Sequence, residues 1–187
     1  QANSGSYDFY LALHSNASAD GSREGTVRGI IAFYYPGSAN GKRAADIFVR
    51  NLKGIYPLPD KVYTSATTAL GEVRQPYMPS VLLELGYHDN TADALWVENN
   101  LEAIAANLVL SLTEYFGLPF VVPLTPWRGT VRTQGSPLNL RAAPALNSAV
   151  VTTMPSGAPV TVYGRYQDWY TVGYNGLLGY AFADYIT

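Results

Sequence analysis

The sequence predicts an α/β domain followed by a small all-β module. Residues 1–120 alternate apolar strand-like runs with helical patterns, whereas residues 128–187 contain short strands separated by turn residues. A chain of 187 residues is long enough to bury one sizeable core and a second, smaller one. We therefore expect two domains, 1–120 and 128–187, joined by a proline-stiffened linker at 121–127.

Three apolar runs are the predicted strands of the first domain: residues 7–14, 27–35 ("VRGIIAFYY") and 81–87 ("VLLELGY"). The last run is apolar at both even and odd positions. Such a run is typical of a strand that is covered on both faces, as in a parallel sheet. We therefore expect a mostly parallel sheet with helices on its faces.

Helical spacing of apolar residues predicts two helices in this domain. The first covers about 42–55. The second is a single long helix that Asn90 or Thr91 can cap and that Gly117 and Pro119 stop. Its expected apolar stripe consists of Leu95, Leu101, Ile104, Leu108, Leu112 and Tyr115.

The sequence pattern of the second domain predicts short strands. Residues 159–164 ("PVTVYG") alternate in polarity, and residues 168–174 lead directly into Asn175-Gly176. An Asn-Gly pair between two such runs is a strong hairpin signal. About 60 residues of this kind predict a small barrel-like module.

The composition and the motifs absent from the sequence exclude several classes of function. Charged residues make up 14% of the chain and its formal net charge is −2, so no electrostatic attraction to nucleic acid is expected. No cysteine is present, which excludes disulfides, Cys-zinc sites and thiol catalysis. No apolar stretch reaches the roughly 18 residues that a membrane span needs. The chain also lacks a G-x-S-x-G elbow, a phosphate-binding loop and a dinucleotide fingerprint.

Two polar residues interrupt or end the apolar runs, and both are candidate site residues. His14 ends the first run and Glu84 lies among leucines in the third. Because ligands bind beyond the carboxyl ends of parallel strands, the two side chains could converge there. Apolar surroundings should raise the pKa of Glu84 toward the range of a general acid or base. The alternatives are a strand-end histidine bound to a backbone carbonyl and an edge-strand glutamate that faces water.

The motifs "FYLALHSNAS" and "PSVLLELGYHDN", in this order and followed by the long helix, resemble the zinc-dependent N-acetylmuramoyl-L-alanine amidases of the Amidase_3 family of bacterial cell-wall hydrolases. The resemblance covers roughly residues 1–118. The tail, "LNLRAAPALNSAVVTTMPSGAPVTVYG" and "DWYTVGYNGLLGYAFADYI", resembles a bacterial SH3 (SH3b) domain over roughly residues 128–187.

The resemblance implies a secreted hydrolase of the cell wall that uses zinc. By this resemblance, His14 is one of the family's three zinc ligands, and Glu84 deprotonates the zinc-bound water that cleaves the bond between N-acetylmuramic acid and L-alanine. The family's other histidine and its zinc-binding glutamate lie in an N-terminal half that has no counterpart in this sequence. Nothing in the family assigns zinc to His88 or Glu24. The partners implied are peptidoglycan and a separate N-terminal segment of the same enzyme.

An alternative is a non-catalytic wall-binding protein, a remnant amidase fold with an SH3b module. It is favoured by the incomplete zinc set and by an aromatic tail that could stack on sugars or peptides. Those aromatic residues could instead fill strand faces and the barrel core, which we favour for Trp169 and Tyr170. The candidate stacking residues are Tyr163, Tyr166, Trp169, Tyr170, Tyr174 and Tyr180.

Overall fold

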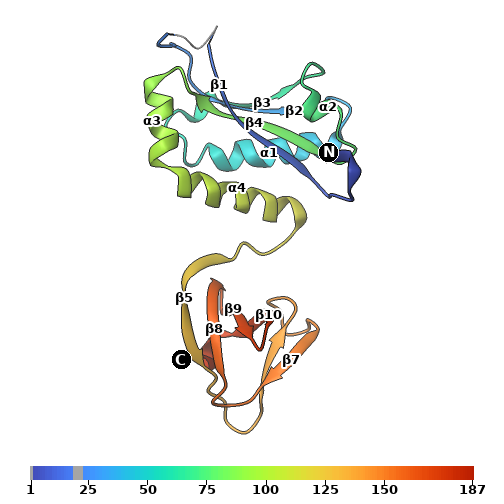
Figure 1. Cartoon of the computed structure of the whole chain (residues 1–187), viewed down its shortest axis with the longest axis vertical. Coiled ribbons are helices and arrows are strands. Elements are labelled where there is room, and N and C mark those ends of the chain that lie inside the picture. The colour runs from blue at the N-terminus through green and yellow to red at the C-terminus, as the bar shows by residue number, and fades with distance from the viewer. Residues whose placement is uncertain (1, 19–22) are drawn as a thin grey trace. The chain divides into compact units, whose positions relative to one another are not determined.

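The computed structural model describes residues 2–18 and 23–187 (Figure 1). The chain divides into two compact units, Gln1–Leu118 (unit 1) and Pro119–Thr187 (unit 2). In the described part of the chain, no helix has the length and apolar character needed to cross a membrane.

A four-stranded sheet forms the centre of unit 1. Its strands lie in the order β1 (Tyr10–Asn16), β4 (Ser80–Tyr87), β2 (Ile30–Tyr34) and β3 (Val62–Ala66). Two of the three pairings, β1 with β4 and β2 with β3, are parallel, and β2 runs antiparallel to β4. The sheet is therefore mostly parallel, and β1 is one of its two edge strands.

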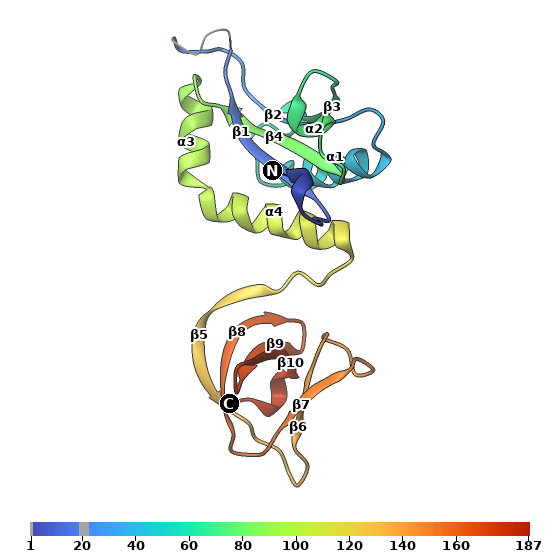
Figure 2. The same ribbon diagram turned by 45° about the vertical axis from the view of Figure 1, so that its right-hand side comes forward.

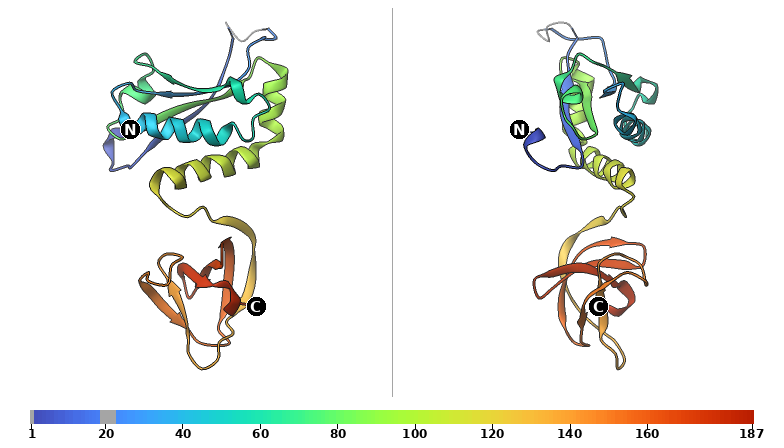
Figure 3. Two further views of the ribbon diagram at one scale, coloured as in Figure 1. Left: turned by 180° about the vertical axis from the view of Figure 1, so that it is seen from behind. Right: turned by 90° about the vertical axis from the view of Figure 1, so that its right-hand side faces the viewer.

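Helices cover the two faces of this sheet unequally. Helices α1 (Ala39–Leu52) and α4 (Leu101–Phe116) lie on one face of the sheet, as Figures 2 and 3 show. Both contribute to the large apolar core. The opposite face, here called the α2 face, carries a smaller cluster built around Ala12, Leu82 and Val73 of the short helix α2 (Gly71–Arg74). The remaining helical segments of unit 1 are α3 (Thr91–Asn99), η1 (Ala2–Ser4) and η2 (Pro59–Lys61).

The alternation of β4 explains both cores. Val81, Leu83 and Leu85 belong to the large core, whereas Leu82 points to the α2 face. Successive side chains of a strand point to opposite faces, so Glu84 follows Leu82 onto the α2 face. The run that is apolar at both even and odd positions is therefore buried on both faces.

The predicted single long helix is two helices. It breaks at Asn100, whose backbone lies outside the helical region (φ −127°, ψ 21°) and whose side-chain amide donates to the Trp96 carbonyl at 2.7 Å. Asparagine offers the backbone such a local alternative to the helix. Leu95 and Leu101, which we expected in the apolar stripe, are 50% and 61% exposed. Strand β3 and helix α2 were not predicted.

Asp93, at the start of α3, is fully buried and gathers four donors. Its carboxylate accepts from Arg28 Nε at 2.7 Å, from the Tyr56 hydroxyl at 2.6 Å, and from the backbone N–H groups of Gly29 and Tyr87, both at 3.1 Å. Burial by itself would raise the pKa of Asp93, but these hydrogen bonds outweigh it and lower that pKa. Asp93 thus ties the end of β4 to the start of β2.

Unit 2 is a six-stranded antiparallel sheet. Its order is β5-β8-β9-β10-β6-β7, and its core contains Val131, Leu140, Met154, Val162 and Val172. The strand bounds are β5 Val122–Thr130, β6 Leu138–Arg141, β7 Val150–Met154, β8 Pro159–Tyr166, β9 Trp169–Tyr174 and β10 Leu177–Phe182, with a short 3-10 helix, η3, at Ala183–Tyr185. Strands β9 and β10 pair across Asn175-Gly176, where both residues have positive φ (50° and 78°), as a two-residue hairpin turn requires.

Residues 122–127 of the expected linker belong to strand β5 instead. Val122 and Pro123 pair with β8, and the register shifts before the pairing resumes at Trp127. The prolines were the reason to expect a linker, but β5 is an edge strand with an irregular register. Edge strands and bulges are the places where a sheet tolerates proline.

Candidate functional site

His14 and Glu84 lie side by side on the sheet. They are register partners in the parallel pair β1–β4, and both side chains belong to the α2 face. The strand periodicity of 2 delivers this arrangement, because Tyr10 and Ala12, which precede His14 by four and two residues, contribute to the apolar cluster on the same face. The polar end of the α2 face thus begins where that cluster stops.

Glu84 has the more unusual environment. It lies between His14 on β1 and Ile31 on β2, and its Oε2 is buried without a hydrogen-bond partner. Burial raises the pKa of Glu84, and a positive charge on His14 or His88 would act in the opposite direction. A carboxyl of this kind holds a proton more readily than an exposed one, which is what a proton-transfer group needs.

Glu72 also reaches this site, although no sequence pattern predicted it. Its Oε2 lies 3.1 Å from His14 Nε2, and its Oε1 accepts from the Tyr10 hydroxyl at 3.2 Å. The side chains of His14 and Glu72 are each 43% exposed. Glu72 belongs to helix α2, whose four residues are too few to show the helical spacing of apolar residues that predicts a helix. Only the tertiary structure brings Glu72 to His14.

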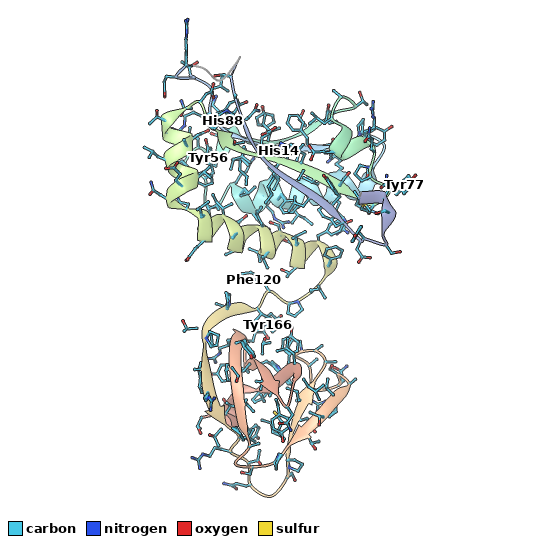
Figure 4. All side chains as sticks on the ribbon, viewed as in Figure 1. His14, Tyr56, Tyr77, His88, Phe120 and Tyr166 are labelled. Carbon is cyan, nitrogen blue, oxygen red and sulfur yellow. The ribbon has the colours of Figure 1, made fainter. Side chains whose placement is uncertain are left out.

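His88 approaches the same end of β1 from the end of β4 (Figure 4). Its Nδ1 lies 3.1 Å from the Ser15 hydroxyl and 3.3 Å from the Ser15 carbonyl, and its backbone N–H donates to the Asn16 carbonyl at 2.8 Å. His88 therefore joins the two strand ends. A positive charge on His88 would lower the pKa of Glu84.

Glu24 is engaged elsewhere. Its carboxylate accepts from the backbone N–H of Thr91 at 3.0 Å and from the Thr91 hydroxyl at 2.7 Å. These bonds lie at the first turn of α3, where a negative charge is favoured by the helix dipole. Glu24 thus serves the helix start.

The described residues do not form a metal site on their own. Over residues 2–18 and 23–187, no group of three or more His, Cys, Asp or Glu side chains is arranged to hold a metal ion. His14 has Glu72 beside it and Glu84 next to it in register, but a structural or catalytic zinc needs at least three protein ligands that converge. The three-ligand zinc site implied by the resemblance therefore does not fit these residues alone.

A groove of about 680 Å³ lies along the first half of β1, away from this pair of residues. Its lining includes Tyr7, Tyr10, Glu72 and Met78, but neither His14 nor Glu84. Glu72 is the residue that connects the groove to the polar end of the α2 face.

Each of the two units matches the model of a known protein family. The model of a family described as N-acetylmuramoyl-L-alanine amidase (Amidase_3) matches residues 1–114. The chain belongs to this amidase family. A second family, the bacterial SH3 domain (SH3_3), matches residues 136–187. The search of curated proteins found no match to the chain.

Solved structures share the amidase fold. The catalytic domain of the CD27L endolysin, which targets Clostridia difficile, is 25% identical, with a TM-score of 0.52 over 60% of this chain and 58% of that one. An N-acetylmuramoyl-L-alanine amidase from Clostridium difficile 630 is 20% identical, with a TM-score of 0.54 over 62% of this chain and 61% of that one. The CwlD amidase of Clostridioides difficile, solved with the GerS lipoprotein, is 19% identical, with a TM-score of 0.55 over 62% and 58%. The amidase chain described here thus spans about three fifths of the length of these structures.

Proposed function

We propose that this chain is part of a peptidoglycan amidase that cleaves the amide bond between N-acetylmuramic acid and the L-alanine of the stem peptide. Membership of the amidase family supports the reaction class. The observation that carries the proposal is Glu84, a partly buried carboxyl with a raised pKa directly beside His14. In this role Glu84 takes the proton from the attacking water and returns it to the departing amine.

His14 is the proposed metal ligand of this chain. Zinc enters the proposal through the family alone, and the described residues do not complete a ligand set, so we derive no step through the metal. The remaining ligands would come from a segment that pairs with β1. The outer edge of β1 supports this, because no described strand pairs with it, and Leu13 on that strand is 53% exposed.

The place of action that we propose is the cell wall, outside the cell. It follows from the substrate of the amidase family and from the bacterial SH3 domain in the same chain. Unit 2 would hold the enzyme on the wall while unit 1 contributes to the chemistry.

The test measures stem-peptide release from purified peptidoglycan by mass spectrometry, with zinc present and with the protein at its natural full length. Glu84→Gln should lower the rate by about 10²–10⁴-fold, the usual contribution of a general acid–base group. The matched control is Glu98→Gln, the same substitution at an exposed position of α3. The proposal fails if the unaltered protein releases no stem peptide or if Glu84→Gln keeps full activity.

A wall-binding protein without catalysis is the second candidate, favoured by the incomplete ligand set. Its test is co-sedimentation with intact cell walls, comparing the full chain with a chain that ends at Leu118, the boundary between the units. Loss of binding on truncation together with no peptide release from the full-length protein would support this candidate. Equal binding by both chains would exclude a wall-binding role for unit 2.

A further inference from the structure

Unit 2 contains a groove that combines aromatic rings with two arginines. It has a volume of about 700 Å³, and its lining includes Arg132, Arg141, Trp169, Phe182 and Tyr185. We propose that this groove binds a peptide with free carboxylates, of the kind that peptidoglycan stem peptides carry, and that Arg132 and Arg141 recognise the carboxylates. The choice of peptide rests on the proposed function, whereas the carboxylate chemistry rests on the groove itself.

The aromatic residues of the groove form one connected wall. Trp169 of β9 and Phe182 of β10 are register partners, with ring centroids 5.4 Å apart in an edge-to-face arrangement. The ring centroid of Tyr185 in η3 lies 6.3 Å from that of Phe182. Trp169 is buried at 7% exposure, whereas Tyr185 is 45% exposed. The wall thus has a fixed inner part and an outer ring on which a ligand can lie.

The other candidate stacking residues do not share this groove. Tyr163 and Tyr174 line a separate hollow near the β9–β10 turn, and Tyr170 packs against the core of unit 2. As expected, Trp169 and Tyr170 serve the packing of the module, although Trp169 also reaches the groove. The predicted aromatic set therefore does not act as a single stacking surface.

The two arginines are held next to the aromatic wall. Arg141 ends β6 and pairs with Tyr180 of β10, and its Nη1 donates to the Ser148 carbonyl at 2.8 Å. The backbone N–H of Arg132 donates to the Tyr185 carbonyl at 2.8 Å. A guanidinium has five N–H donors, so each arginine keeps donors for a ligand.

Within residues 2–18 and 23–187, no carboxylate forms an ion pair with Arg132 or Arg141. The ion pairs found in the described structure all lie in unit 1. Unit 2 has four arginines and two aspartates, a formal charge of +2, and the groove itself has Arg132 and Arg141 against Asp184. A carboxylate is the group that an arginine binds in a bidentate, charge-assisted way.

This charge pattern favours the peptide of peptidoglycan over its glycan. N-acetylglucosamine is uncharged, and N-acetylmuramic acid has a free carboxylate only where its stem peptide has been removed, so the intact glycan would use the aromatic wall but leave both guanidiniums without a charged partner. A stem peptide supplies carboxylates for Arg132 and Arg141, and Asp184 on the same groove suits an amine on the same peptide. The aromatic wall then packs against the peptide backbone and its small side chains.

The experiment is calorimetric titration of the full chain with three probes: a synthetic stem peptide with free carboxylates, its fully amidated analogue, and a peptide-free N-acetylglucosamine oligomer. The groove variant is R132Q/R141Q. The matched control is R128Q/R165Q, which removes the same two charges at arginines that do not line the groove. R132Q alone is included because Arg141 also holds the 142–149 loop through Ser148.

The unaltered chain should prefer the acid peptide to its amide by tenfold or more. R132Q/R141Q should weaken binding of the acid peptide at least tenfold, R132Q should weaken it in the same direction, and R128Q/R165Q should leave it within about twofold. Charge-assisted hydrogen bonds are strong enough for a tenfold effect. Equal weakening by both double variants, equal binding of acid and amide, or binding of the sugar oligomer alone would overturn the proposal.

These outcomes are separate from those of the amidase assay. Titration detects binding whether or not unit 1 cleaves anything, so a chain that binds the peptide but releases none from peptidoglycan contradicts the amidase activity alone. A chain that cleaves peptidoglycan but does not distinguish acid from amide contradicts the groove alone.

Discussion

The two units of this chain handle polar groups in opposite ways. Every buried polar or charged residue among the described residues lies in unit 1, and unit 2, which is described throughout, has none. Unit 1 carries a formal charge of −4, from eight basic and twelve acidic residues, whereas unit 2 carries +2. Burying polar groups costs free energy unless they are partnered, so a fold that keeps them does so for a specific role.

The roles differ within unit 1. Asp93 is a buried acid whose donors satisfy it, and it fixes the geometry of the strand ends. Glu84 is a partly buried acid with an oxygen left without a partner, and its pKa moves up rather than down. For these two carboxyl groups, the direction of the pKa shift follows whether the fold supplies hydrogen-bond donors. Unit 2 has no buried polar residue, although the hydroxyl oxygens of Thr133 and Thr171 are buried without a hydrogen-bond partner.

The largest expected effect is the loss of stability of unit 1 alone when Asp93 is replaced. Asp93→Ala should destabilise unit 1 by about 3 kcal/mol, because it leaves Arg28 and Tyr56 without their common acceptor. Amide hydrogen exchange read by mass spectrometry should show faster exchange in residues 23–118 and unchanged exchange in 119–187. Tyr56→Phe, the control, removes one hydrogen bond and should cost about 1 kcal/mol. Faster exchange in both units would contradict their independence.

The converse change acts on unit 2. Leu140 is fully buried in the core of that unit, so Leu140→Ala should cost about 3 kcal/mol through lost burial and the cavity left behind. The same exchange measurement should report faster exchange in 119–187 alone. Leu146→Ala, at a position that is 74% exposed, is the matched control and should change stability little. A large effect of the exposed substitution would be incompatible with this packing.

A smaller effect tests the hairpin of unit 2. Gly176 has a φ of +78° in the β9–β10 turn, and a Cβ there would meet no neighbour, so only the backbone conformation opposes a side chain. Gly176→Ala should therefore cost about 1 kcal/mol, measured as a lower midpoint of chemical unfolding for unit 2. Gly71→Ala, where φ is not positive and the added carbon has ordinary contacts, is the control. Equal costs at both positions would argue against the turn conformation.

The smallest expected effect concerns Glu84 and pH. Burial raises the pKa of Glu84 in the folded state above its value in the unfolded state. As the pH rises from the unfolded-state pKa to the folded-state pKa, ionisation of Glu84 therefore lowers the free energy of unfolding. Glu84→Gln should therefore stabilise unit 1 at neutral pH, and the gain should vanish below the unfolded pKa. Thermal unfolding between pH 4 and pH 8 measures it, with Glu98→Gln as the flat control. A gain that persists at acid pH would contradict a raised pKa.

Local pattern was sufficient for much of the fold. The three apolar runs that predicted strands are found in β1, β2 and β4, and the 42–55 pattern is found in α1, shifted to Ala39–Leu52 because Ser38 caps the helix. The break at Asn100 was not predicted because it depends on a side-chain hydrogen bond that competes with the helix. Strand β5 was not predicted because its prolines are tolerated only at an edge strand with irregular pairing.

The sequence by itself determined the order of the two domains, the strand that contains His14, the strand that contains Glu84 and the Asn-Gly hairpin, because each depends on residues close together in the chain. The predicted end of the first strand at His14 was wrong, since β1 continues to Asn16. Only the tertiary structure decided the register that sets His14 beside Glu84, the approach of Glu72, the burial of Asp93 and the groove between Arg132 and Arg141. Those features join residues far apart in sequence. Their positions depend on how strands pair and cores pack, which no local pattern records.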